Sequence, residues 1–241
     1  MILYVNGDSH SAGCEAVHPA GFLTDNSKYR PEYTHPFWKE EIPWSPYPDN
    51  LEVSYGKLLA DKLNATLHCH ARSAGSNDRI IRTTLEYLKE FKPELVVIGW
   101  STWEREEWYN DEDNQWYQVN GSGIDSVPVK WKDRYKNFVI NVDWIKKTTE
   151  AHEKLWLFHL ELQKLQVKHL FFNACQNFYH YKLWNNITYN WGDNYVLPYE
   201  NFSYIQYLKD KNYKHSEFIH FGPDGHAEWA EFLFPYLTKL L

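Results

Sequence analysis

The feature that most constrains this 241-residue chain is the alternation of short apolar runs with amphipathic helical patterns. The clearest run, LVVIGW at residues 95–100, is apolar throughout, which is typical of a strand buried on both faces. Further runs occupy residues 1–7, 65–70 and 168–173, and helical spacing of apolar residues occurs at 54–65, 79–91, 148–166 and 224–241. Strands separated by crossover helices form a parallel sheet covered on both faces, so the pattern predicts an α/β fold.

The pattern fits one domain over residues 1–241, interrupted by two segments without a sustained period, at about 102–147 and 174–200. We expect these segments to be long insertions over a single sheet, since connections of this length often carry binding loops or lids. Aromatic residues make up 18% of the chain, which contains 12 Trp. The rings could stack on sugars or fill a core, and four of those in the first insertion are Trp103, Trp108, Trp116 and Trp131.

Charge and composition exclude several classes of partner. With 25 Lys and Arg against 32 Asp and Glu, the formal net charge is -7, so we expect no nucleic-acid partner. No apolar stretch is long enough to span a membrane and the first residues do not resemble a signal peptide, so we expect a soluble protein, cytoplasmic or otherwise without a signal peptide. Nothing in the pattern indicates an oligomeric state.

A metal or cofactor is not expected either. The chain has 12 His, and Asp8, His10, His220 and His226 could in principle converge on an ion. However, no H-E-x-x-H or comparable ligand spacing is present. The three cysteines are widely spaced and odd in number, which favours buried thiols over a disulfide framework or a zinc site.

Chemistry-bearing residues follow the first apolar run and recur near the C-terminus. In an open parallel sheet, ligands bind beyond the carboxyl ends of the strands, which is where Gly7-Asp8-Ser9-His10 would lie. A serine nucleophile needs a base to accept its proton, and an acid to hold that base in the right tautomer. Ser9, His220 and Glu217, three residues before His220, could supply this set.

Two histidines near the C-terminus could act as the base. His220 directly precedes a predicted turn, so it should stay on a loop at the rim of the sheet. His226 has Asp224 two residues away in the predicted first turn of the last helix, where residues two apart do not face each other. The spacing therefore favours His220.

Taken together, Gly7-Asp8-Ser9-His10 and the run IHFGPDGHAEWA at residues 219–230 resemble the first and last sequence blocks of the SGNH (GDSL-like) hydrolase superfamily. The resemblance extends over nearly the whole chain through the order of the blocks. It implies a three-layer α/β domain with a flavodoxin-like parallel sheet, Ser9 as nucleophile, His220 as base and no cofactor. Glu217 stands at the acid position, where the family usually has Asp.

The same resemblance implies an oxyanion hole that differs from the usual one. Gly75 matches the glycine of the second block, and Ser9 and Gly75 would each donate a backbone N–H. The family's G-x-N-D block follows the third strand, where this chain has Gly99-Trp100-Ser101-Thr102. We therefore expect Asn77 or Ser101 to take the role of the missing asparagine.

The function implied by this resemblance is that of a serine esterase or deacylase acting on a small or carbohydrate-linked ester, with a short acyl group such as acetyl. His10, Trp100 and Trp103 are the residues expected to contact the substrate. A glycan-binding protein that has lost turnover, and an acyltransferase using the same serine, remain alternatives because fold alone does not separate them.

Overall fold

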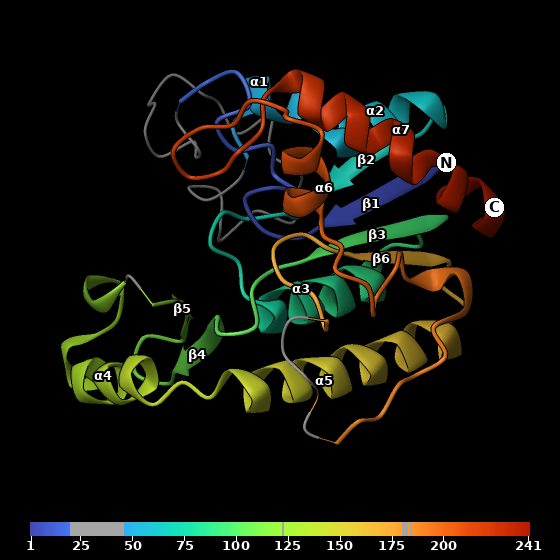
Figure 1. Ribbon diagram of the computed structural model, residues 1–241. Helices are drawn as coiled ribbons and strands as arrows, with labels where there is room; N and C mark the ends of the chain where they lie inside the picture. The colour runs from blue at the N-terminus through green and yellow to red at the C-terminus, as the bar shows by residue number, and fades with distance from the viewer. Residues whose placement is uncertain (20–45, 122, 180–182, 184) are drawn as a thin grey trace.

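A four-stranded parallel sheet forms the centre of the protein (Figure 1). The computed structural model describes residues 1–19, 46–121, 123–179, 183 and 185–241. The strands are β1 (Ile2–Asn6), β2 (Thr66–Cys69), β3 (Leu95–Trp100) and β6 (His169–Asn173), in the order β2-β1-β3-β6. The sequence predicted each of these strands to within one residue at either end.

Helices cover both faces of the sheet, as the alternation predicted. Figure 1 places α2 (Tyr55–Lys62) and α7 (Pro223–Leu240) on one face, and α3 (Asn77–Glu90) and α5 (Trp144–Lys164) on the other. The remaining elements in the described residues are α1 (Pro48–Glu52), β4 (Glu106–Asn110), β5 (Gln115–Val119), α4 (Lys132–Ile140), α6 (Tyr204–Asp210) and short 3-10 turns at Ile124–Ser126, Val129–Trp131 and Gly192–Asn194. No helix in the described part of the chain has both the length and the apolar character needed to cross a membrane.

Alternation along the strands divides the core into two layers. In β1, Leu3 and Val5 pack in the layer of α2 and α7, whereas Tyr4 packs in the layer of α3 and α5. All three side chains are fully buried. The aromatic residues of the chain are concentrated in these layers, so core packing accounts for much of its aromatic content.

The first insertion is folded rather than irregular, which differs from the sequence prediction. Strands β4 and β5 form an antiparallel hairpin, and Trp108, Val119, Val127 and Tyr135 pack into a small core beside it. The Arg134 guanidinium carbon lies 3.8 Å from the centroid of the Trp108 ring. The pattern was missed because this core is too small to impose a long helical or strand period on the sequence.

Two contacts attach this hairpin to the start of α3. The Gln118 side-chain oxygen accepts a hydrogen bond from Ser76 N at 2.9 Å, and Glu107 is paired with Arg82 at 2.7 Å. Ser76 also caps α3, because its hydroxyl accepts from Arg79 N at 3.2 Å. The insertion therefore fixes the loop that leads into α3.

The order of the strands determines where a ligand can approach. The connection from β1 to β2 contains α2 on one face, and the connection from β2 to β3 contains α3 on the opposite face. From β1 the chain first adds β2 on one side of the sheet and then β3 on the other side, so β1 and β3 are neighbours at the point where the strand order reverses. Such a reversal leaves a crevice beyond the carboxyl ends of the two strands, and the residues after Asn6 and Trp100 lie there.

Candidate active site

The loop after β1 turns tightly so that Ser9 comes directly above the strand ends. Ala12 N donates to Asp8 O and Cys14 N donates to Ser9 O, both at 3.0 Å. A Cβ on Gly7 would lie 2.1 Å from Ser11 Oγ and 2.9 Å from Gly99 O, so only glycine lets the ends of β1 and β3 approach this closely. Ser9 itself is 6% exposed.

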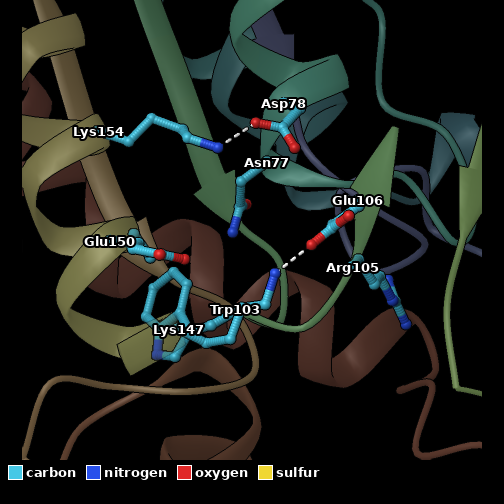
Figure 2. Close-up of a pocket in the computed structure, with 9 residues that line it drawn as sticks. Asn77, Asp78, Trp103, Arg105, Glu106, Lys147, Glu150 and Lys154 are labelled. Carbon is cyan, nitrogen blue, oxygen red and sulfur yellow. Dashed lines mark hydrogen bonds and ion pairs between the residues drawn. The ribbon is translucent and has the colours of Figure 1, made fainter. Parts of the chain in front are cut away.

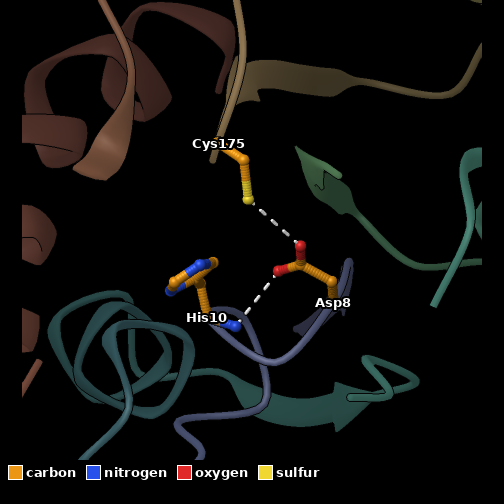
Figure 3. A group of neighbouring side chains, drawn as sticks. All are labelled: Asp8, His10 and Cys175. Carbon is orange, nitrogen blue, oxygen red and sulfur yellow. Dashed lines mark hydrogen bonds between the residues drawn. The ribbon is translucent and has the colours of Figure 1, made fainter. Parts of the chain in front are cut away.

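Asp8 is a buried carboxylate held by several donors (Figure 3). Its Oδ1 accepts from His10 N at 3.1 Å, and its Oδ2 accepts from Ser101 Oγ at 2.9 Å and from Arg105 Nη1 at 3.4 Å. Burial by itself raises the pKa of Asp8, but the nearby His10 and Arg105 and the bond from Ser101 hold the pKa below its ordinary value. Asp8 is therefore an ionised anchor for the loop.

Among the described residues, one group of side chains could hold a metal ion. The donor atoms of Asp8, His10 and Cys175 lie within 4.8 Å of one another. The Cys175 thiol already donates to Asp8 Oδ2 at 3.4 Å, and burial raises the pKa of this thiol well above its ordinary value. Because the thiol is protonated and Arg105 balances the carboxylate, the contacts of Asp8 and Cys175 are satisfied by protein groups.

His10 connects the Ser9 loop with the C-terminal histidine turn. Its ring centroid lies 5.2 Å from that of His220 and 5.4 Å from that of Tyr204. Burial lowers the pKa of His10 to about 4, so the ring is neutral at neutral pH. The structure therefore brings His220 to the loop that carries Ser9.

A carboxylate from this same loop holds His220. Glu15 Oε2 lies 3.0 Å from His220 Nδ1 and also accepts from Ser216 Oγ at 2.5 Å. Partial burial alone raises the pKa of Glu15, but these hydrogen bonds from Ser216 and His220 hold the pKa below its ordinary value. The result is an ionised carboxylate on Nδ1, which leaves Nε2 as the ring nitrogen available to a nucleophile.

Glu217, the acid predicted from the sequence, does not occupy this position. Its side chain is exposed, and the turn from Ser216 to His220 directs Ser216, rather than Glu217, toward Glu15. The turn closes through a bond from Ser216 N to His220 O at 2.8 Å, and Ile219 has a φ of 64°. Spacing within the C-terminal block could not reveal a partner 205 positions away in the chain.

Glu15 adopts an unusual backbone conformation. Its φ of 60° lies in the left-handed region, which is uncommon for a residue other than glycine, asparagine or aspartate. Holding a residue there costs about 1 to 3 kcal/mol, and such residues cluster at functional sites. In the sequence, the one indication of this role of Glu15 is its position six residues after Ser9. Glu15 matches none of the sequence blocks of the SGNH superfamily.

His226 lies in the core instead of at the site. It is 1% exposed, and its Nδ1 accepts a hydrogen bond from Tyr55 N at 3.3 Å. Burial lowers the pKa of His226 to about 3, so the ring stays neutral. This histidine stabilises the contact between α2 and α7.

We expect His226 to make the protein less stable in mild acid. The unfolded chain takes up a proton near the ordinary histidine pKa of about 6.5, whereas folded His226 resists protonation until the pH approaches 3. The contribution of neutral His226 to the free energy of unfolding is fully present above about pH 7. It decreases as the pH falls, by about 2 kcal/mol at pH 5. His226→Asn keeps an acceptor for Tyr55 N, so urea unfolding at pH 7 and pH 5 should show a drop smaller by that amount. An equal drop in wild type and variant would contradict the assignment.

The three predicted oxyanion donors are all engaged with other protein groups. Gly75 N donates to Arg72 O at 2.9 Å, and Ser101 Oγ donates to Asp8. The Asn77 amide nitrogen lies 3.3 Å from Ser101 O, and its oxygen accepts from Ser101 N at 2.9 Å. These groups hold the β3 loop against α3, so in this structure their hydrogen bonds go to protein groups.

The Ser9 backbone N–H remains available. No residue in the described part of the chain accepts it, so it could donate to a bound oxyanion. The Ser9 hydroxyl likewise makes no hydrogen bond to His220, although both residues are described. Catalytic hydrogen bonds are often long before substrate binds and tighten in the complex.

The two predicted tryptophan contacts differ in position. Trp100 is fully buried in the layer of α3 and α5, where its ring packs against Phe171 with centroids 4.9 Å apart, so it is not a substrate contact. Trp103 stacks on Phe178 and is 4% exposed, but it lines a small cavity beside the site. The sequence could not distinguish them because Trp100 ends the apolar run and Trp103 lies only three residues beyond it.

This cavity has a volume of about 150 Å³ and is lined mainly by charged side chains (Figure 2). Lys147 and Lys154 of α5 contribute to one side, where they pair with Glu106 and Asp78 respectively. Arg105 also lines the cavity, and Figure 2 shows its guanidinium turned away from the two lysines. Since the same guanidinium contacts Asp8, Arg105 separates this cavity from the Ser9 loop.

Comparison with known proteins places the chain in a family. A profile of a family of unknown function, DUF6071, matches residues 48–181, more than half of the sequence. The chain belongs to the DUF6071 family. The part of this DUF6071 protein that matches contains Gly75, Asn77, Ser101 and Arg105, whereas Ser9 and His220 lie outside it. No curated protein sequence matches the chain.

Several solved structures resemble this chain in fold. TesA superposes with a TM-score of 0.54 at 12% identity, with all of both chains covered, and the DUF6071 protein thus has the α/β fold of SGNH hydrolases. An acetyl xylan esterase, Est2A, from the rumen bacterium Butyrivibrio proteoclasticus gives 0.42 at 12% identity over 99% of this chain and 63% of that one. A lipolytic protein of the G-D-S-L family from Desulfitobacterium hafniense gives 0.38 at 12% identity over 100% and 99%. At these identities the likeness concerns the fold.

Proposed function

We propose that this protein is a serine ester hydrolase in which Ser9 is the nucleophile and His220 its general base. The observation that carries the proposal is the contact of His220 Nδ1 with Glu15, a carboxylate on the loop that begins with Ser9. This contact selects the tautomer in which Nε2 accepts a proton. The SGNH fold supports the same reading, since it places the loop at the carboxyl end of the first strand.

The reaction would proceed in two halves. Ser9 Oγ attacks the ester carbonyl carbon while its proton passes to His220 Nε2, and the imidazolium then gives that proton to the departing alcohol. A water molecule next attacks the acyl group on Ser9, losing its proton to His220, and the carboxylic acid leaves as Ser9 regains the proton. Glu15 stabilises the imidazolium in both halves through Nδ1.

A short acyl group, such as acetyl, fits the surroundings best. Ser9 is nearly buried, and the cavity lined by Arg105, which contacts Asp8 of the Ser9 loop, is small and lined mainly by charged residues. A long acyl chain needs an extended apolar groove, which the described residues lining this cavity do not form. The alcohol could be small or part of a carbohydrate, because charged and amide side chains suit hydroxyl groups.

The test combines covalent labelling with turnover. A fluorophosphonate probe should label wild-type protein on Ser9 and leave Ser9→Ala unlabelled, because a base-activated serine attacks phosphorus as it attacks an ester. The wild type should also hydrolyse p-nitrophenyl acetate and acetylated sugars, with acetyl esters turning over faster than octanoyl esters. Equal labelling of Ser9→Ala would place the nucleophile elsewhere, and faster octanoyl turnover would contradict the short acyl group.

A second candidate function is binding of a glycan or ester without turnover. The observation that favours it is the engagement of Gly75, Asn77 and Ser101, which leaves the site with few free donors for an oxyanion. Binding of acetylated sugars, measured by calorimetry, with no labelling of Ser9 would support this candidate over the first.

A further inference from the structure

Among the described residues, Arg105 is the cationic side chain that contacts both Asp8 and Ser101 at the site. Its Nη1 donates to Ser101 Oγ at 2.8 Å and to Asp8 Oδ2 at 3.4 Å. Asp8 and Ser101 are fully buried, so these contacts fix the guanidinium against the rigid ends of β1 and β3. A donor held in this way is preorganised, because it needs no rearrangement when charge develops nearby.

The Arg105 guanidinium also has N–H groups that donate to no described residue. Arginine carries five N–H groups, and both contacts come from Nη1 alone. In the part of the chain that the structure describes, Nε and Nη2 of Arg105 donate to no residue, and the side chain is 21% exposed. These N–H groups are therefore free to donate to a ligand.

Ester hydrolysis at Ser9 places a negative charge on the former carbonyl oxygen, and that charge needs donors. The donors of Gly75, Asn77 and Ser101 are engaged within the protein, which leaves the Ser9 N–H as the one free backbone donor already identified. We propose that Arg105 supplies the second donor to this oxyanion, together with a positive charge. The proposal rests on the proposed function.

Arg105 contacts two buried groups at the ends of β1 and β3. Its guanidinium lies 2.8 Å from the Ser101 hydroxyl, which itself donates to Asp8. Figure 2 shows the guanidinium turned away from Lys147 and Lys154, although Arg105 also lines the charged cavity. The alternative role is that of a structural counter-ion for Asp8, and the two roles make different predictions.

The experiment compares Arg105→Gln with Arg105→Lys, using Arg134→Gln as the control because Arg134 packs on Trp108 in the insertion. If Arg105 contacts the oxyanion, Arg105→Gln should lower kcat on p-nitrophenyl acetate by about 100-fold with KM changed little. Affinity for a short alkylboronic acid, whose adduct with serine carries a negative oxygen, should fall by a similar factor. Arg105→Lys keeps a charge beside Asp8 and should lose less, and Arg134→Gln should match the wild type.

The proposal would be overturned if Arg105→Gln kept the wild-type kcat. It would also be overturned if kcat fell while the affinity for the boronic acid stayed the same, because Arg105 would then act only as a counter-ion for Asp8. If Arg105→Gln does not fold, the Arg105→Lys variant decides by the same two measurements. Each of these outcomes leaves the proposed function standing, provided that the wild type turns over ester. Absence of both turnover and Ser9 labelling in the wild type would instead remove the proposed function.

Discussion

His220→Ala is expected to lower kcat on p-nitrophenyl acetate by about 1,000- to 10,000-fold, the upper part of the range for a general base. The reason is that, among the described residues, His220 is the histidine whose ring contacts a carboxylate on the loop that carries Ser9. The ring of His10 packs against that of His220 and, within the described part of the chain, makes no hydrogen bond to a carboxylate. His226 lies in the core, where its Nδ1 accepts a hydrogen bond from Tyr55 N. Turnover is measured under saturating substrate, after subtraction of the rate of Ser9→Ala.

The matched control is His226→Asn, which changes a second histidine of the same C-terminal segment. Because His226 lies in the core and its acceptor is preserved by asparagine, this variant should keep kcat within about threefold at pH 7.5. Near-normal turnover in His220→Ala, together with loss in His226→Asn, would reverse the assignment of the base.

Much of the fold could be predicted from local pattern. The run LVVIGW became β3 at the residues predicted, because a strand buried on both faces needs an unbroken apolar run. The start of α3 lies two residues before the predicted start at 79, because Ser76 caps the helix. The hairpin and α4 were missed because their small core contains few residues, and α6 was missed because seven residues carry too little periodicity.

The site was predicted only in part because its decisive contacts are not local. The order of the sequence blocks indicated Ser9 and His220, because Ser9 follows the first strand of the sheet and His220 precedes the last helix. The partner of His220 comes from the first loop, and no spacing rule connects Glu15 with a residue 205 positions later. The hydrogen bonds between Asn77 and Ser101 could not be predicted for a related reason, because they depend on how β3 meets α3, which single motifs do not encode.

Glu15→Gln is expected to lower kcat by about 1,000- to 10,000-fold, the cost seen when an amide replaces the acid of such a triad and the base takes the wrong tautomer. Glutamine fills the same space but removes the charge that stabilises the His220 imidazolium. Fluorophosphonate labelling of Ser9 should slow in parallel, whereas the thermal midpoint should change little because Glu15 is only partly buried.

Two comparisons separate this positioning role from a structural one. Glu217→Gln changes an exposed carboxylate in the same turn as His220 and should leave kcat unchanged. In the His220→Ala background, Glu15→Gln should cost almost nothing further, because residues that act as one unit are strongly non-additive. If the Glu15 substitution still lowers kcat by its full factor when His220 is absent, Glu15 acts by some route other than the imidazole, and if Glu217→Gln is the variant that loses turnover, the acid predicted from the sequence is the functional one.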